Sequence, residues 1–235
     1  MRRPRLPLIL TAVVLAVAFC AILIANFGFT GPASTSVERF VGAAERAGAV
    51  NMVSAIYLNV RLFDTLLEVL VFAVAVLGVR FYLTARGRPE AVEKIPESRV
   101  VGVAADVLLP LILLVSVYVT IHGHLSPGGG FSGGVIAGSG LLLAAMVAGT
   151  DAVDRRLGGR FLGRVEWAAL LGVFVLASVP VALGRTPLSD LLPAGTPGAI
   201  GSGGSILLYN MLIGLKVFIG SWVIVKHFVD HRGEI

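Results

Sequence analysis

Six long apolar stretches limit what this chain can fold into more than any other feature of its sequence. Because a helix rises 1.5 Å per residue, about 20 apolar residues cross the roughly 30 Å hydrocarbon core of a bilayer. The stretches meet that length and cover about residues 6–28, 56–80, 100–121, 131–149, 165–184 and 206–227. The sequence therefore predicts an all-α membrane protein with six transmembrane helices. The charged fraction of only 14% excludes an ordinary soluble domain.

The first stretch has a second interpretation, as a signal peptide that follows three arginines near the N-terminus. A signal core is about 7–15 residues long, and the apolar run over 6–29 is longer. Phe19 before Cys20 also departs from the small-residue pattern of a cleavage site. We therefore expect a retained helix. Cys20 is the only cysteine and is expected to pack among apolar groups, so the chain has no internal disulfide and no thiolate cluster.

The positions of the basic residues indicate the orientation of the helices. Lys and Arg accumulate on the cytoplasmic side of short loops. Fourteen of the 19 lie at the two termini or in the segments 80–99 and 155–164, and three lie on the opposite side. Both termini are therefore predicted to be cytoplasmic, and the segment HGHLSPGGGFSGG (122–134) faces outward. The same placement leaves no basic face that would bind a nucleic acid.

One polar segment divides the predicted helices into two groups. Residues 84–99, TARGRPEAVEKIPESR, form the most polar run of the chain. We predict a two-helix module over 1–83, a cytoplasmic linker over 84–99 and a four-helix module over 100–235. The outer segment 185–205 is rich in Pro, Gly and Ser and is expected to be irregular.

Three ionisable side chains lie within the second stretch. Arg61, Asp64 and Glu68 stand at i, i+3 and i+7, which places them on one helix face and lets neighbours pair. Glu68 lies about 18 Å along the axis from position 56 by the helical rise, near mid-membrane. A charge there costs at least about 2.5–3.5 kcal/mol, so we expect Glu68 to face protein or water and to handle protons or cations. For Arg61 and Asp64, a structural ion pair near the outer surface and a functional role both stay open.

Lys216 lies within the sixth stretch, about 15 Å along the axis from position 206. Its side chain is too short to carry the ammonium easily to either interface, so it needs a partner. Burial disfavours the charge and an adjacent carboxylate restores it, so a passing proton or cation can toggle such a pair. A pair with Glu68 or with a neighbouring subunit is our hypothesis, and a static ion pair with another helix is the alternative.

Four more polar side chains lie near the ends of the stretches. Glu166, at the start of the fifth, is most simply interfacial. Asp106 lies about six residues into the third, where Pro110 opens backbone polarity that a carboxyl group or water satisfies, so a pathway role and a structural role both stay open. His227 and His231 stand at the cytoplasmic exit, where we expect a solvated face.

The segment HGHLSPGGGFSGG does not match a phosphate-binding or a metal-binding site. A phosphate loop of the form G-x-x-x-x-G-K-[ST] needs a lysine, and neither Lys nor Arg occurs between residues 121 and 150. His122 and His124 stand two apart with no obvious third ligand outside the membrane, so we predict no zinc site and no cofactor. Near the outer end of the third stretch these histidines suit a proton relay, and interfacial polar groups are the alternative.

The glycines of this segment have an explanation in helix packing. Pro127 ends the preceding helix, and Gly128 and Gly129 let the backbone turn tightly. Gly130, Gly134 and Gly138 then recur every four residues and give the fourth helix a smooth face for close contact with a neighbour. The fourth helix is therefore predicted to be a packed inner helix.

With these residues in hand, the second module resembles the MnhB family, the B component of the Mrp-type multisubunit sodium/proton antiporters. The similarity lies in GHLSPGGGFSGG (123–134) and YNMLIGLKVFIG (209–220) and covers about residues 100–230. The first module resembles the C-terminal end of the large A component, or the equivalent small subunit of membrane-bound hydrogenases. There the similarity lies in NMVSAIYLNVRLFDTLLEVLVFAVAVLGV (51–79).

The resemblance implies one subunit of a larger assembly in a bacterial or archaeal cell membrane. Its partners would be large antiporter-like subunits and small membrane subunits, with Na⁺ and H⁺ as the transported ions. It carries Arg61, Asp64, Glu68, His124 and Lys216 onto family motifs. The two modules in one polypeptide depart from the usual antiporter arrangement.

Three functions are therefore open. The first is a membrane subunit that helps form the sodium/proton pathway of an antiporter and supports its assembly. The second is the same part of a hydrogenase or related respiratory complex, whose redox catalysis lies in other subunits because this chain has no cluster-binding cysteines. The third is a scaffold in which every buried charge is statically paired. In none of them does the chain carry catalytic residues of its own.

Overall fold

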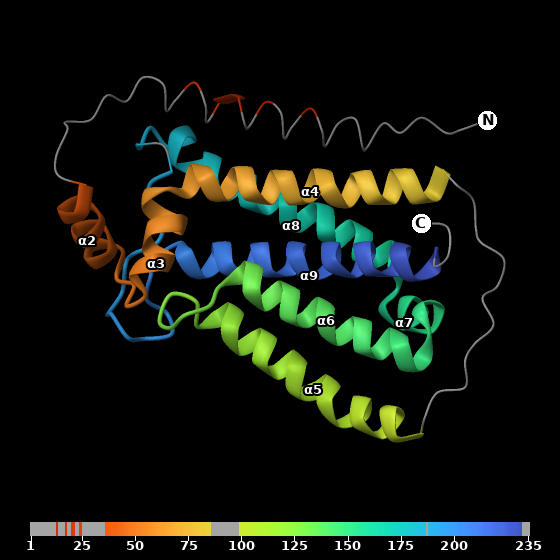
Figure 1. The fold of residues 1–235 in the computed structure, drawn as a ribbon. Helices are drawn as coiled ribbons and strands as arrows, with labels where there is room; N and C mark the ends of the chain where they lie inside the picture. The colour runs from red at the N-terminus through yellow and green to blue at the C-terminus, as the bar shows by residue number, and fades with distance from the viewer. Residues whose placement is uncertain are drawn as a thin grey trace.

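The computed structural model describes residues 36–85, 99–186 and 188–231, together with five isolated positions between residues 13 and 24. Within these ranges every regular element is a helix. In chain order they are α2 (Ser36–Ala47), α3 (Met52–Ala55), the π-helix η1 (Ile56–Val60), α4 (Leu62–Ala85), α5 (Arg99–Ile121), α6 (Gly130–Ala148), α7 (Thr150–Leu157), α8 (Gly159–Ala182) and α9 (Ile206–Asp230). The five long helices run side by side, and the short elements lie at their ends (Figure 1).

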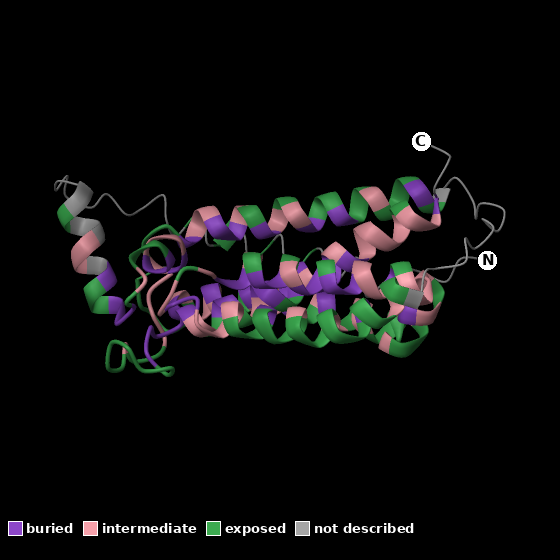
Figure 2. Cartoon of the chain, turned by 60° about the horizontal axis from the view of Figure 1, so that its bottom comes forward, coloured by how far each residue is buried: buried purple, intermediate pink, exposed green. Residues whose placement is uncertain are grey.

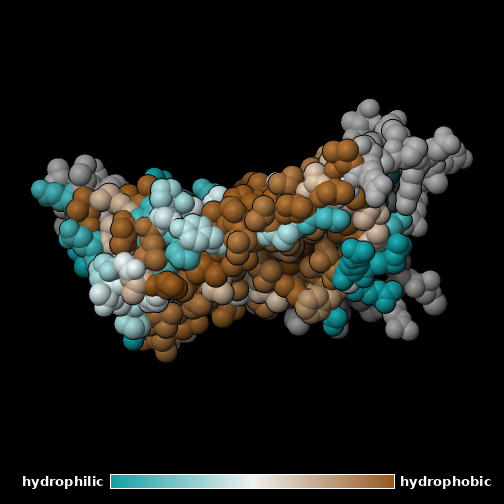
Figure 3. Space-filling view, turned by 90° about the horizontal axis from the view of Figure 1, so that it is seen from below, coloured by the Kyte–Doolittle hydropathy of each residue, from teal (hydrophilic) through white to brown (hydrophobic). Residues whose placement is uncertain are grey.

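Five of these helices, α4, α5, α6, α8 and α9, are long and apolar enough to cross a membrane. The predicted all-helical class is confirmed for the described ranges. Figure 3 shows, on one face, an apolar middle zone with hydrophilic residues gathered at the two ends, as a bilayer requires. The first predicted stretch (6–28) and most of the predicted linker (84–99) lie outside the described residues.

Helix α9 is the centre of the bundle. Half of its most apolar 18-residue stretch is buried within the chain. The corresponding share for α5, which packs on α6 at the edge of the bundle, is 11%. The main core lies where η1, α4, α8 and α9 meet, and the residues buried from all four include Leu58, Leu66, Val173 and Ile213. Figure 2 shows this burial concentrated on the inner helix faces, with α5 largely exposed.

The second predicted stretch starts differently from our expectation. Residues 56–60 form a π-helix, and the regular helix begins only at Leu62 because the backbone of Arg61 leaves the helical region (φ −116°, ψ 32°). The carbonyl of Tyr57 accepts a hydrogen bond from Oγ1 of Thr65 (2.6 Å) at this turn. Glu68 therefore lies about 9 Å from the start of α4 by the helical rise, closer to that end than predicted.

Helix α8 begins six residues earlier than predicted from hydropathy. Gly158 adopts a left-handed conformation (φ 66°) that ends α7 and starts α8 at Gly159. The helix thus includes a first turn and a half that carries two arginines, Arg160 and Arg164. As a result Glu166 lies two turns inside the helix, where it is buried, and the prediction that it is interfacial is wrong.

The glycine face of α6 lies against α9. A Cβ atom added at Gly134 would stand 2.7 Å from the carbonyl oxygen of Gly214 and 2.9 Å from the amide nitrogen of Phe218. One added at Gly138 would stand 2.7 Å from Cβ of Ser221. The two helix backbones are therefore in direct contact, which is the arrangement that small residues at four-residue spacing allow.

We predict that Gly134→Ala destabilises the full chain by about 1–3 kcal/mol, the usual cost of forcing a methyl group into a packed interior. The neighbours are backbone atoms of α9, which cannot move aside as a side chain would. Thermal unfolding in detergent measures the effect. Gly163→Ala is the matched control, because nothing lies within 4 Å of its added Cβ, and equal stability of the two variants would contradict the contact.

Candidate functional site

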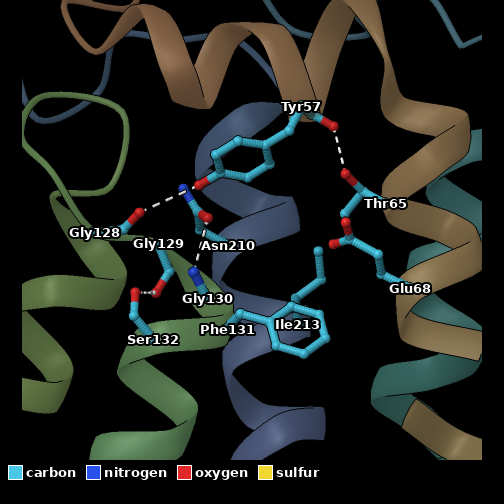
Figure 4. A pocket seen from close by; sticks show the side chains of 10 residues that line it. All are labelled: Tyr57, Thr65, Glu68, Gly128, Gly129, Gly130, Phe131, Ser132, Asn210 and Ile213. Atoms are coloured by element: carbon cyan, nitrogen blue, oxygen red, sulfur yellow. Dashed lines mark hydrogen bonds between the residues drawn. The ribbon is translucent and has the colours of Figure 1, made fainter. Parts of the chain in front are cut away.

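A pocket of about 320 Å³ lies between the start of α4, the loop before α6, and α9. Figure 4 shows side chains from all three elements converging on it. Its lining consists of Tyr57, Thr65, Glu68, Gly128, Gly129, Gly130, Phe131, Ser132, Asn210 and Ile213. The structure thus brings the predicted acidic residue Glu68 next to the predicted glycine loop.

The glycines shape the wall of this pocket. Gly128 and Gly129 have φ values of 156° and 137°, which side chains rarely tolerate. The turn leaves the carbonyl of Gly128 free to accept a hydrogen bond from the hydroxyl of Tyr57 (3.3 Å). The amide of Gly130, at the start of α6, donates to Oδ1 of Asn210 on α9 (2.9 Å). Loop, π-helix and α9 are thereby held together at one point (Figure 4).

Asn210 also presents an unused donor. The residue is fully buried, and its Nδ2 has no hydrogen-bond partner within the described ranges. A buried amide without a partner costs about 1–3 kcal/mol, so such groups are normally satisfied by water. The adjoining pocket is large enough for several water molecules. The sequence analysis did not select Asn210, because one polar residue in an apolar run carries no distinctive spacing.

Glu68 is exposed at the mouth of the pocket. Figure 4 shows its carboxylate turned toward Thr65. Among the ion pairs of the described residues, none involves Glu68. Arg61 pairs instead with Asp64, at the end of α4 and largely in contact with solvent. Any counter-ion of this carboxylate must therefore come from what fills the pocket or covers its mouth.

A second charged pair lies deeper in the bundle. Nζ of Lys216 donates to Oε1 of Glu166 on α8 (2.5 Å), and the two side chains are only 2% and 9% exposed. The ammonium also lies 5.2 Å from the ring centroid of Phe72. The hypothesised pair of Lys216 with Glu68 is not formed, because the buried Glu166, which was set aside as interfacial, supplies the carboxylate.

The other predicted polar residues lie apart from the pocket. His124 is fully buried near the outer segment, with Nε2 close to the carbonyl of Ala199 (3.4 Å) and Nδ1 unpartnered within the described ranges. His122 stacks on Tyr118 with ring centroids 4.3 Å apart. Asp106 is exposed on α5. The loop joins these histidines to the pocket only through its backbone.

Polar contacts hold helix α7 against the C-terminal end of α9. Thr150 donates to Asp230 (2.5 Å), and Lys226 pairs with Asp154 (2.6 Å). His231 is buried, so the expectation of a solvated face is wrong for this residue. In the ranges that the structure describes, no group of three His, Cys, Asp or Glu side chains is placed to hold a metal ion.

The outer segment is tied to the π-helix by Asp190. Its Oδ2 accepts a hydrogen bond from Nδ2 of Asn59, and its Oδ1 accepts one from the amide of Ser205 (3.1 Å). Burial raises the pKa of Asp190 above its usual value of 3.8, and the hydrogen bonds from Ser205 and Asn59 oppose that shift only in part. No sequence motif pointed to this contact, because the two partners lie 131 positions apart.

We predict that Lys216→Met lowers the stability of the chain by about 3–5 kcal/mol, because it leaves the carboxylate of Glu166 buried without its partner. Thermal unfolding of the full chain in detergent measures the loss. The double variant Glu166→Gln with Lys216→Met should regain most of it, since no charge is then left unpaired. A double variant as unstable as the single one would contradict the pairing.

We predict that the outer segment is held most firmly at low pH. Because the folded-state pKa of Asp190 is raised, ionisation as the pH climbs from about 4 costs the folded form more than the unfolded one. Hydrogen–deuterium exchange at the Ser205 amide, corrected for intrinsic rates, should show protection that falls with rising pH. Asp190→Asn should remove this trend, with the Leu183 amide as an internal control, and a rise in protection would contradict the sign.

Comparison with known proteins identifies the family. A family model described as a domain related to the MnhB subunit of Na⁺/H⁺ antiporters matches residues 100–223. A probable A/B subunit of a K⁺/H⁺ antiporter from Rhizobium meliloti (strain 1021) is 30% identical over 150 residues, which are 53% of this chain and 15% of that protein. An uncharacterized protein of Methanocaldococcus jannaschii is 25% identical over 193 residues, 72% of this chain and 73% of the relative.

Two solved structures share the fold. A chain of the membrane-bound sulfane sulfur reductase, an archaeal respiratory membrane complex, superposes with a TM-score of 0.68 at 29% identity, over 95% of this chain and 97% of its own length. A chain of the Mrp complex from Dietzia sp. DQ12-45-1b gives a TM-score of 0.65 at 24% identity, over 100% of this chain and 27% of that one. This chain, a multi-pass membrane protein, belongs to the MnhB family.

Proposed function

We propose that this chain is a membrane subunit of a multisubunit cation/proton antiporter of the Mrp type, where it forms part of the sodium/proton pathway and supports assembly. Its partners are large antiporter-like subunits and small membrane subunits. The chain itself performs no chemical reaction and supplies side chains along which ions move.

One observation carries this proposal: Glu68 stands exposed on an apolar spanning helix at a pocket that Asn210 also lines, without a counter-ion among the described residues. A charged carboxylate on an apolar spanning helix is costly unless it is hydrated or paired. Water, a cation or a partner subunit must therefore surround it. An ionisable group maintained at that cost is typical of an ion pathway.

The same proposal extends to the organisation of the chain. It has six spans with both termini in the cytoplasm, a two-helix module over 1–83, a linker over 84–99 and a four-helix module over 100–235. The relative of Rhizobium, which this chain matches over only 15% of its length, carries the joint name A/B. That name supports a chain in which parts of both components are continuous.

Further residues take supporting roles in the proposed pathway. Nδ1 of the buried His124, which has no hydrogen-bond partner among the described residues, is placed for a proton relay near the outer segment. His122 would take part in the same relay. The pair of Arg61 and Asp64 lies near the pocket mouth, and Lys216 contributes a second charge within the bundle. Asp106, exposed on the spanning helix α5, needs a polar contact from a partner.

A second candidate function is the equivalent subunit of a respiratory complex. The matched chain of the sulfane sulfur reductase has nearly the same extent as this chain, with 97% of it covered, whereas the matched antiporter chain is far longer. Redox catalysis would then lie in other subunits. Purifying the chain with its natural partners separates the two candidates, because a redox subunit in the complex would identify the second.

We predict that Glu68→Gln lowers cation/proton exchange by the assembled complex about tenfold or more, because the neutral amide no longer takes up a proton or a cation. Exchange is measured in everted membrane vesicles as the dissipation of a pH gradient on addition of Na⁺ or K⁺. Assembly is checked by co-purification of the partner subunits.

Glu45→Gln is the matched control, because Glu45 is exposed outside the spanning helices and should be replaceable without effect. Normal exchange by an assembled Glu68→Gln complex would overturn the proposed role of the pocket and leave the chain as a scaffold.

A further inference from the structure

Two ionisable centres of this chain lie on either side of the contact between α4 and α9, which we call the seam. The pocket with Glu68 opens between α4 and α6, and the pair of Lys216 and Glu166 lies between α9 and α8. Both centres border α4 and α9, which pack directly on each other. On α9, Ile213 faces the pocket and Lys216 follows one turn later. The centres are therefore neighbours along the seam, and what separates them decides whether they communicate.

The ring of Phe72 fills the seam between them. Phe72 follows Glu68 by one turn of α4, so both side chains lie on the same helix face. On one side its ring meets that of Phe131, which lines the pocket, edge to face with centroids 5.8 Å apart. On the other side its face lies 5.2 Å from the ammonium of Lys216. The ring thus contacts both centres at once.

The opposite wall of the seam is shaped for this ring. A Cβ atom added at Gly220 would stand 2.6 Å from Cε1 of Phe72, so only glycine at this position leaves the ring its space. Gly220 lies one turn after Lys216 on α9, on the same helix face. Phe72 is therefore seated between a glycine and an ammonium.

Beyond the ring lies a second, much smaller cavity. It borders Lys216, Glu166, Val76 and Arg80, and its volume of about 10 Å³ holds at most one water molecule. None of its lining residues borders the larger pocket. Arg80 lies near the far end of α4, three turns beyond Glu68. The two cavities thus have separate linings, and Phe72 contacts one residue of each, Phe131 and Lys216.

We propose that the Lys216–Glu166 pair is a second charge site on the ion pathway, and that Phe72 is the positioning residue that closes its connection to the Glu68 pocket. This inference rests on the proposed function and adds to it that the pathway leads from the Glu68 pocket to the buried pair. When the ring moves aside, water from the pocket reaches Glu166, and a proton taken up there neutralises the carboxylate. The ammonium of Lys216 has then lost its charged partner, and the return of the Phe72 ring face restores a favourable contact, which closes the seam again.

Replacing Phe72 by Ala tests this proposal in the assembled complex. Without the ring, water bridges the seam, so the passive proton permeability of proteoliposomes should rise roughly fivefold or more in the absence of Na⁺ and K⁺, as expected when an apolar constriction is removed. Phe81→Ala, at an exposed position of the same helix, should leave the permeability unchanged. Phe72→Leu, which keeps an apolar side chain in the seam, should give a smaller rise and replaces Phe72→Ala if that variant does not assemble.

A triple variant shows whether the leak uses the buried pair. Adding Lys216→Met and Glu166→Gln to Phe72→Ala should return the permeability to near that of the unmodified complex, an effect that loosened packing alone would not produce. An assembled Phe72→Ala complex as tight as the unmodified one would overturn the proposal, and so would a leak that persists without the pair. Failure of the proposed function is distinguishable, because it shows as normal exchange by Glu68→Gln, a variant that leaves Phe72 in place.

Discussion

The contact between α6 and α9 at the glycine face is the constraint on which the rest of the structure depends. At Gly130 and Gly134 the backbones of the two helices are in direct contact, and at Gly130 the amide of α6 also donates to the side chain of Asn210. This contact places the glycine loop beside the π-helix and so forms the pocket. It also leaves α4 on the other side of α9, in contact with α8 and not closely with α6. The pocket lies between α4 and α6 because the glycines hold α6 close to α9 and away from α4.

Buried polarity is handled in two different ways in this bundle. Lys216 and Glu166 satisfy each other, and their attraction offsets the cost of removing two charges from water. Glu68 and Nδ2 of Asn210 have no such partner in the described ranges and border a pocket of about 320 Å³. The closed pair belongs to the folded core, whereas the open groups depend on whatever enters the pocket. A scaffold would need only the first arrangement, whereas the proposed pathway also needs the second.

The five long helices of the described ranges were predictable from sequence because the apolar runs are long, and the glycine face because its spacing is regular. The start of α8 was not, since it depends on the left-handed turn at Gly158 and not on hydropathy. This error removed Glu166 from the set of candidate partners for Lys216. Pairing between helices is set by their three-dimensional packing, which spacing within one helix does not reveal. For the same reason Asn210 and Phe72, whose importance lies in contacts with other elements, gave no signal.

Helix α4 is the element that the two centres share, and it is less buried within the chain than α6 or α8. It carries Glu68, Phe72 and Arg80 on one face, and only a third of its most apolar 18-residue stretch is buried within the chain. Exposed apolar residues such as Val71 and Val74 cover the opposite surface. A neighbouring subunit that packs there would shift α4 as a unit and so act on pocket, ring and buried pair together. Since packed interfaces switch between discrete arrangements, a small displacement of α4 is sufficient to move one aromatic ring out of a seam.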